Sequence, residues 1–80
     1  MKPSVGRILH FYTKDTAKQF NGVGEGPYAA IVSQVHGDHC ASLTVFPPFA
    51  APFSAGSVML EEQPADSDSY QRCGWPPRVD

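Results

Sequence analysis

The chain has 80 residues with a formal charge of −2, and its pI is about 5.8. A chain of this length forms one domain with a thin core, because a domain this small buries only about 60% of the surface that its unfolded chain exposes. Its lysines and arginines are scattered, so binding of duplex nucleic acid through many phosphate contacts is not expected. No stretch is apolar for long enough to span a membrane, and no membrane partner is expected.

The first predicted strand covers residues 5–12, and both of its faces carry apolar side chains. One face holds Val5, Arg7, Leu9 and Phe11, and the other holds Gly6, Ile8, His10 and Tyr12. Residues 13–27 then change to polar residues and glycine, which predicts a flexible loop. Asp15 is a candidate cap for one short helical turn within this loop.

A β-hairpin is the clearest feature of the sequence, with apolar and β-branched arms on either side of Gly37 and Asp38. Gly at the first position of a two-residue loop supplies the positive φ that such turns need. The register that follows pairs Ala30 with Val45, Val32 with Leu43, Gln34 with Ala41, Val35 with Cys40 and His36 with His39. It turns Ala30, Val32, Ala41, Leu43 and Val45 toward the core.

Prolines follow the hairpin in residues 47–55 and argue against regular strand pairing there. Phe49 and Phe53, on either side of Pro52, are expected to form an arm that contacts another subunit. A fourth strand is predicted over residues 56–63, with Val58 and Leu60 on one face. Residues 64–69 predict a solvated linker, and residues 70–75 a short fifth strand.

Four to five short antiparallel strands predict a mainly β fold, in which residues 1–80 form a single small barrel of the SH3-like type. An OB-like barrel is the alternative. That fold places a helix between its third and fourth strands, and the proline-rich stretch argues against such a helix.

Several clusters of polar residues have side chains that could carry chemistry, and none is predicted to be catalytic. His36, Asp38, His39 and Cys40 are possible metal ligands, but only the two histidines share a face, so a polar hairpin tip without metal is expected. His39 cannot activate the Cys40 thiol, because neighbouring strand residues point to opposite faces, and Cys40 is expected to be buried. By the same alternation, Glu61 and Glu62 do not form an acid and base pair.

The three glycines at positions 22, 24 and 26 lack the strand, helix and lysine of a phosphate-binding loop and are interpreted as a connector. The two cysteines, Cys40 and Cys73, are expected to be free thiols. No secretory leader is recognised, so the expected location is the cytoplasm.

Aromatic side chains are numerous for so small a barrel, and some are expected at the surface, where rings bind peptides, stack on bases or join subunits. The candidate residues for binding a ligand or partner are Arg7, Phe11, Tyr12, Tyr28, Phe49, Phe53, Trp75 and Arg78. The thin core also favours a homo-oligomer.

Four segments of the chain form a recognisable pattern: Lys-Pro-Ser-Val-Gly-Arg-Ile-Leu-His-Phe-Tyr at residues 2–12, Ala-Ala-Ile-Val at 29–32, Cys-Ala-Ser-Leu-Thr-Val-Phe at 40–46 and Gly-Trp-Pro-Pro-Arg at 74–78. In these segments the chain resembles short uncharacterised proteins of bacteriophages and some bacteria. The resemblance spans nearly the whole chain and implies a phage origin and the cytoplasm of a host cell. No enzyme activity comes with the pattern.

These observations predict a non-enzymatic binding module without a cofactor, which occupies a host protein or sequesters a small anionic ligand. The alternative is binding of single-stranded nucleic acid through Phe11, Tyr12, Tyr28 and Trp75, with arginines on the phosphates. A third hypothesis, from the enzyme class, is metal-dependent hydrolysis at His36, Asp38 and His39.

Overall fold

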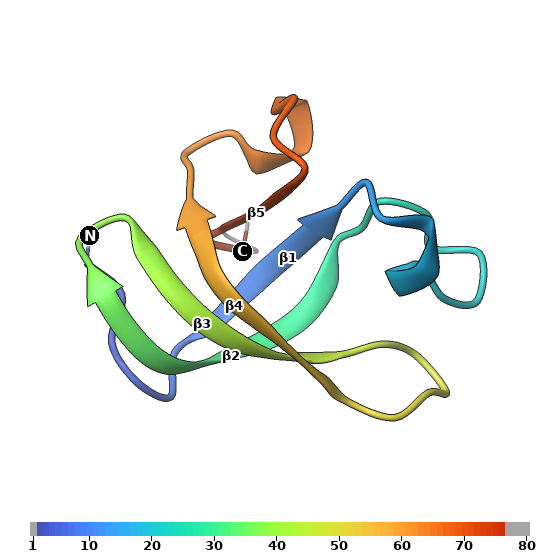
Figure 1. The fold of residues 1–80 in the computed structure, drawn as a ribbon, viewed down its shortest axis with the longest axis horizontal. Helices are drawn as coiled ribbons and strands as arrows, with labels where there is room; N and C mark the ends of the chain where they lie inside the picture. Colours follow the sequence, from blue (N-terminus) through green and yellow to red (C-terminus); the bar gives the residue numbers. More distant parts are fainter. Residues whose placement is uncertain (1, 77–80) are drawn as a thin grey trace, which may run out of the picture.

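Five strands close into a barrel in the computed structural model, which describes residues 2–76 (Figure 1). The strands are β1 (Ile8–Thr13), β2 (Tyr28–Gly37), β3 (Cys40–Phe46), β4 (Phe53–Leu60) and β5 (Gln71–Gly74). Neighbouring strands are antiparallel, except that β5 pairs with β4 in parallel and with β1 antiparallel to close the barrel. The predicted mainly β barrel of four to five strands is confirmed. Residues 47–52 between β3 and β4 contain no helix, as the prolines of this stretch predict.

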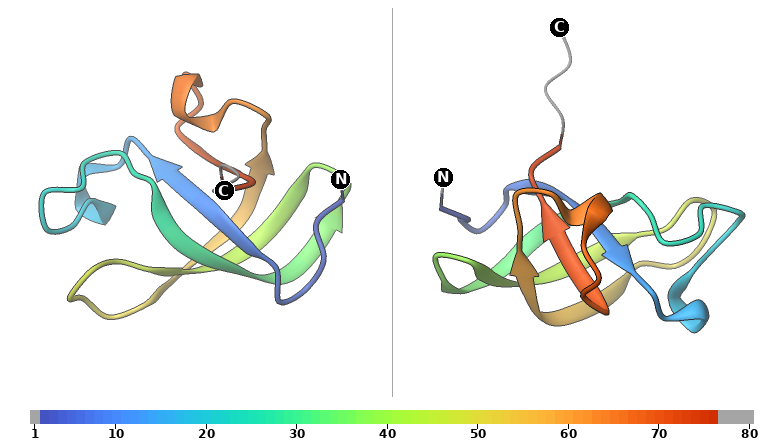
Figure 2. Two further views of the ribbon diagram at one scale, coloured as in Figure 1. Left: turned by 180° about the vertical axis from the view of Figure 1, so that it is seen from behind. Right: turned by 90° about the horizontal axis from the view of Figure 1, so that it is seen from above.

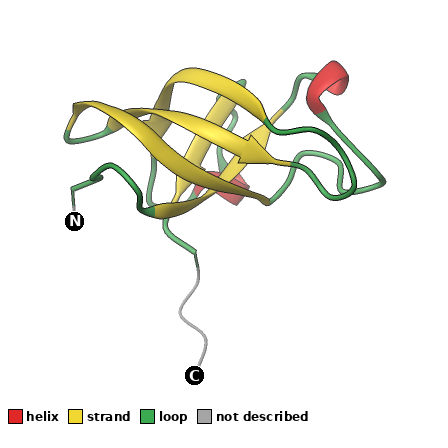
Figure 3. Ribbon diagram, turned by 90° about the horizontal axis from the view of Figure 1, so that it is seen from below, coloured by secondary structure: helices red, strands yellow, loops and turns green. Residues whose placement is uncertain are grey.

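Two short 3-10 turns interrupt the connections, η1 (Thr16–Lys18) after β1 and η2 (Pro64–Asp66) after β4 (Figure 3). Asp15 caps η1 by accepting a hydrogen bond from the backbone N–H of Ala17, as predicted. The segment expected to be a solvated linker begins with η2, and Pro64 is buried against the barrel. Figure 2 shows η2 and β5 lying together on one side of the barrel. No helix in residues 2–76 has the length and apolar character to cross a membrane.

The barrel interior is filled by side chains from all five strands. The buried apolar residues are Leu9, Phe11, Tyr28, Ala30, Val32, Ala41, Leu43, Val45, Ala55, Val58, Leu60 and Cys73. All five hairpin residues predicted to face inward are among them. Val58 and Leu60, predicted to share one face of the fourth strand, are both buried as well. The period-2 alternation of a strand explains this agreement, since it sorts the apolar side chains onto one face.

The hairpin turn differs from the prediction. Gly37 pairs with Cys40, so the two-residue loop is Asp38 and His39 rather than Gly37 and Asp38. The predicted pairs of Ala30 with Val45 and of Val32 with Leu43 are correct.

Nearer the turn the predicted pairing is wrong. Gln34 pairs with Ser42, and Val35 pairs with Ala41. The register shifts between Val32 and Gln34 and again between Val35 and Gly37, and each shift adds one residue on the β2 side. Such bulges increase the local twist and bend of a strand, which helps a five-stranded sheet to close.

The fourth strand begins three residues earlier than predicted. Phe53 pairs with Val45 and Ala55 pairs with Leu43, directly after Pro52. A bulge then falls between Ala55 and Val58, where Ser57 has a φ of 52°. The first strand begins later than predicted, at Ile8, because the chain turns at residues 5–6.

Candidate binding groove

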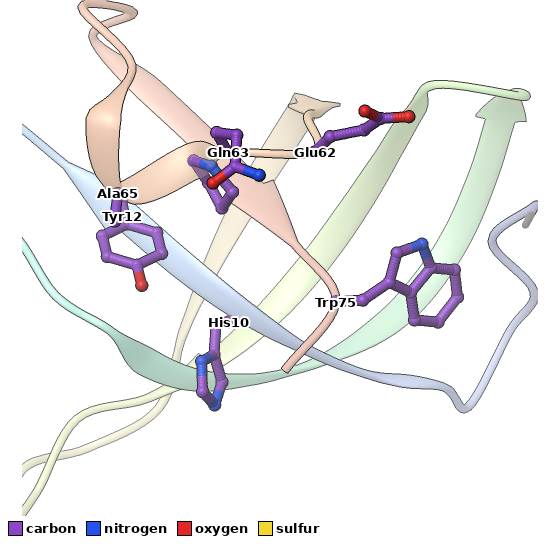
Figure 4. A pocket seen from close by; sticks show the side chains of 7 residues that line it. His10, Tyr12, Glu62, Gln63, Ala65 and Trp75 are labelled. Atoms are coloured by element: carbon purple, nitrogen blue, oxygen red, sulfur yellow. The ribbon is translucent and has the colours of Figure 1, made fainter. Parts of the chain in front are cut away.

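Trp75 follows β5 directly and lines three neighbouring hollows on one side of the barrel. The first, of about 310 Å³, is lined by His10, Tyr12, Glu62, Gln63, Pro64, Ala65 and Trp75 (Figure 4). The second, of about 380 Å³, is lined by Gly6, Arg7, Ile8 and Trp75. The third, of about 120 Å³, is lined by His39, Leu60, Glu61, Glu62 and Trp75. We name the three hollows together the Trp75 groove.

One wall of the Trp75 groove is the outer face of β1. Ile8, His10 and Tyr12 alternate with the buried residues of the strand and therefore point outward together. β1 is hydrogen-bonded to β2 on one side and to β5 on the other, which fixes these three side chains on a rigid element. His10 pairs with Gly74, so Trp75, the residue directly after β5, is brought beside this face.

The opposite wall is the segment that follows β4. The backbone N–H of Glu61 donates to the carbonyl of Cys73, which ties this segment to β5. Gly74 makes this approach possible, because a Cβ at that position would lie only 2.5 Å from Pro64 Cγ and 2.8 Å from the carbonyl oxygen of Glu61. Figure 4 shows Glu62 and Gln63 above Tyr12, His10 and Trp75.

Cations already lie against both large rings of the groove. The guanidinium carbon of Arg7 lies 5.5 Å from the ring centroid of Trp75, and that of Arg72 lies 5.3 Å from the ring centroid of Tyr12. Both distances are within the range of cation–π attraction. The carbonyl of Arg7 accepts a hydrogen bond from the N–H of Val32, which holds Arg7 at the edge of the barrel.

The structure brings together only part of the set of binding residues proposed from the sequence. Arg7, Tyr12 and Trp75 meet in the Trp75 groove. Phe11 and Tyr28 are fully buried in the core and present no surface to a ligand. The Tyr28 hydroxyl donates to the Gly24 carbonyl and accepts from the Phe20 N–H, so its role is to hold the long loop.

The remaining members of that set lie elsewhere. Phe53 is half-buried and packs on Phe11, with 6.1 Å between ring centroids, and on Phe20 at the same separation. Phe49 is fully exposed at the tip of the β3–β4 loop and lines none of the three hollows. Arg78 lies outside the described residues.

Sequence reasoning missed Ile8, His10, Glu62 and Gln63 as lining residues. The alternation of the first strand had already placed Ile8 and His10 on the same face as Tyr12, so that signal was present. The same alternation placed Arg7 on the opposite face of the strand. Because the chain turns before Ile8, however, Arg7 lines the same groove as Ile8. No sequence pattern indicates that the segment after β4 covers β1.

The candidate metal ligands at the hairpin tip do not converge on one site. His36 Nε2 lies 2.7 Å from Ser42 Oγ on the exposed side of the hairpin, whereas His39 lies in the turn and lines the groove. Within residues 2–76, no three His, Cys, Asp or Glu side chains are placed to share a metal ion. The Ser42 hydroxyl also accepts a hydrogen bond from the N–H of Ser57, and neither His36 nor Ser42 lines the Trp75 groove.

The two thiols are free and differ in environment. Cys40 is half-buried rather than buried as predicted. Cys73 is fully buried, and its thiol contacts the Met59 carbonyl at 3.5 Å. Burial, with smaller contributions from Cys40 and Glu61, raises the pKa of the Cys73 thiol to about 12, so it is not a nucleophile at neutral pH.

Fold and site together define a small closed β-barrel with an aromatic groove on one side. Comparison of the chain with protein-family models, with curated proteins and with solved structures found no match.

Proposed function

We propose that this protein is a non-enzymatic binding module that holds an extended segment of another protein in the Trp75 groove. The observation that carries the proposal is the position of Trp75, a half-buried ring that lines three adjoining hollows. Aromatic side chains in open grooves are the usual anchors for peptide segments. The resemblance to phage proteins makes a host protein the expected partner.

The shape of the groove favours a linear ligand. Its lining residues on one wall include Ile8, His10 and Tyr12 along β1, which span roughly 13 Å at the rise of a β-strand. Because β1 is paired on both sides, the lining side chains are positioned before the ligand arrives, which lowers the entropy cost of binding.

A small anionic ligand is the second candidate, and one observation favours it. The hollow beside Arg7 is open next to Gly6, where a Cβ would meet no atom within 4 Å, so a phosphate or carboxylate has room to approach the guanidinium. The carboxylates of Glu61 and Glu62 in the neighbouring hollow act against this candidate.

Binding of single-stranded nucleic acid is supported less by the structure than by the sequence. Two of the four rings proposed as stacking platforms, Phe11 and Tyr28, are in the core. The other two, Tyr12 and Trp75, share a hollow with Glu62, whose charge repels phosphates.

Trp75 is the only tryptophan of the chain, which allows a specific test. Protein labelled with 5-fluorotryptophan gives one fluorine NMR signal, which comes from the groove. Fractions of a bacterial lysate are then added to it, and because they are unlabelled they contribute no fluorine signal of their own. We expect the protein fraction to shift or broaden this signal, and protease treatment of that fraction to abolish the effect. No change with the protein fraction would overturn the proposal, and a change with the small-molecule fraction alone would establish the second candidate instead.

A matched pair of variants shows whether the groove itself is the site. Ile8 and Val35 are both exposed, β-branched strand residues, but only Ile8 lines the groove. We expect Ile8→Glu to abolish the change in the fluorine signal and Val35→Glu to preserve it. Equal behaviour of the two variants would place the binding surface elsewhere.

A further inference from the structure

We infer that the segment bound in the Trp75 groove carries an arginine side chain, which enters the hollow between Trp75 and the carboxylates of Glu61 and Glu62. This inference rests on the proposed function and names the chemistry of the occupant. The hollow has a volume of about 120 Å³, and Leu60 and His39 complete its lining.

The two carboxylates are the first line of evidence. In the described part of the chain, neither Glu61 nor Glu62 takes part in an ion pair. Glu61 is half-buried and its backbone is tied to Cys73, so its position is fixed by the barrel. Among the described residues, His39 is the one basic side chain that lines this hollow, and no lysine or arginine does.

The ring of Trp75 is the second line of evidence. This barrel already stacks two of its own guanidinium groups on aromatic rings, Arg7 on Trp75 and Arg72 on Tyr12. A planar guanidinium suits such a site because it stacks on rings and donates two hydrogen bonds to a carboxylate. Leu60 offers apolar surface to the methylene groups of the same side chain.

The charge of the surrounding surface is the third line of evidence. The segment of residues 61–71 contains Glu61, Glu62, Asp66 and Asp68 and no lysine or arginine. Only Asp68 has an ion-pair partner among the described residues, Lys14 at 3.8 Å. This wall of the groove is therefore complementary to a basic segment, and such complementarity steers a partner and selects among partners.

The test uses two synthetic peptides that differ only in one charge. The probe is acetylated Pro-Pro-Arg-Pro-Pro, chosen because proline keeps a peptide extended, and its control carries citrulline, the neutral isostere of arginine, in place of arginine. Titration against the 5-fluorotryptophan-labelled protein gives both dissociation constants. We expect the arginine peptide to bind at least tenfold more tightly than the citrulline peptide.

The carboxylates are then tested directly. The double variant Glu61→Gln with Glu62→Gln is expected to reduce the preference for arginine to less than twofold, without changing affinity for the citrulline peptide. Asp66→Asn removes a charge from the same segment outside the hollow and is expected to leave the preference intact.

Equal affinities of the two peptides, or no binding of either at millimolar concentration, would overturn the inference. A preference that survives in the double variant would do the same. The proposed function has its own test in the lysate fractions, so its failure is seen separately.

Discussion

The guanidinium of Arg72 lies 2.9 Å from the carboxylate of Glu25 and so connects β5 to the long loop after β1. The same guanidinium donates through Nε to the Pro64 carbonyl at 2.7 Å and through Nη1 to the Ser69 carbonyl at 3.1 Å. Only 2% of the Arg72 side chain is exposed, against 50% for Glu25. One buried cation therefore holds together two connections, the loop between β1 and β2 and the segment between β4 and β5. Its stacking on Tyr12 links them to the groove.

Replacement of Arg72 by methionine is expected to destabilise the protein by about 3 kcal/mol, because two backbone carbonyls lose their partner and a buried pair is broken. Glu25→Gln is the matched variant. It keeps the side-chain length and an acceptor oxygen on the exposed side of the pair, so we expect a loss of about 1 kcal/mol. Urea denaturation of both variants measures the two changes, and losses of equal size would contradict the view of Arg72 as the central contact.

Local sequence rules predicted most of the core but not the groove. Ala30, Val32, Leu43 and Val45 could be placed inward because their apolar pattern has the period of a strand. Two bulges then displaced the hairpin turn by one residue, and such bulges depend on closure of the whole sheet rather than on the residues beside them. The four side chains still point into the core, because both register shifts lie between the hairpin turn and the pairs of Ala30 with Val45 and of Val32 with Leu43.

The groove could be predicted only in part, because its two walls are 50 residues apart in the sequence. Tyr12 and Trp75 were recognised from composition, as rings too numerous for a thin core. Their meeting depends on the pairing of His10 with Gly74 and on the absence of a side chain at Gly74, which are long-range contacts. Composition alone does not distinguish Phe11 and Tyr28 from Tyr12 and Trp75, because all four are large rings. Only the alternation and packing of the strands place Phe11 and Tyr28 in the core.

Gly74→Ala is expected to destabilise the protein by about 2 kcal/mol, a typical value for overpacking. The new Cβ would lie 2.5 Å from Pro64 Cγ and 2.8 Å from the Glu61 carbonyl oxygen, so the segment after β4 must move away from β5. Gly56→Ala is the control, since its Cβ would meet only Ser42 Oγ, at 4.0 Å. Thermal unfolding compares the two variants. Equal melting temperatures would mean that the segment after β4 moves away from β5 without loss of stability.

Stability is expected to fall as the pH rises from about 9 to about 12, partly because of Cys73. Burial first, and then the negative charges of Cys40 and Glu61, raise the pKa of this thiol from 9.0 to about 12 in the folded protein. Between these values the unfolded chain releases the proton and the folded protein keeps it, so unfolding becomes more favourable with increasing pH. Below pH 9 the thiol is protonated in both states and makes no difference.

The contribution of Cys73 is isolated by comparison with Cys73→Ala. The free energy of unfolding of the unmodified protein is expected to fall more steeply in this range, by up to about 1.4 kcal/mol per pH unit relative to the variant. Lysine and tyrosine titration affects both proteins equally and cancels in the difference. Parallel curves for the two proteins between pH 9 and 12 would show that the thiol has the same pKa in both states.

Phe49 combines full exposure with a φ of 56°, a backbone conformation that asparagine tolerates better than phenylalanine. The loop that presents it is braced by a hydrogen bond from Asn21 Nδ2 to the Pro48 carbonyl. Phe49→Asn is therefore expected to raise the free energy of unfolding by about 1 kcal/mol if the ring contacts nothing. If the ring is instead the predicted arm of a homo-oligomer, the variant gains no stability at high protein concentration and its native mass falls to the 8.7 kDa of one chain.

Native mass spectrometry, together with denaturation at two protein concentrations, separates these outcomes. Tyr70→Asn, at another exposed ring, is the control. A multimer that persists unchanged in Phe49→Asn would exclude the arm and leave the exposed outer face of the sheet as the surface that joins subunits.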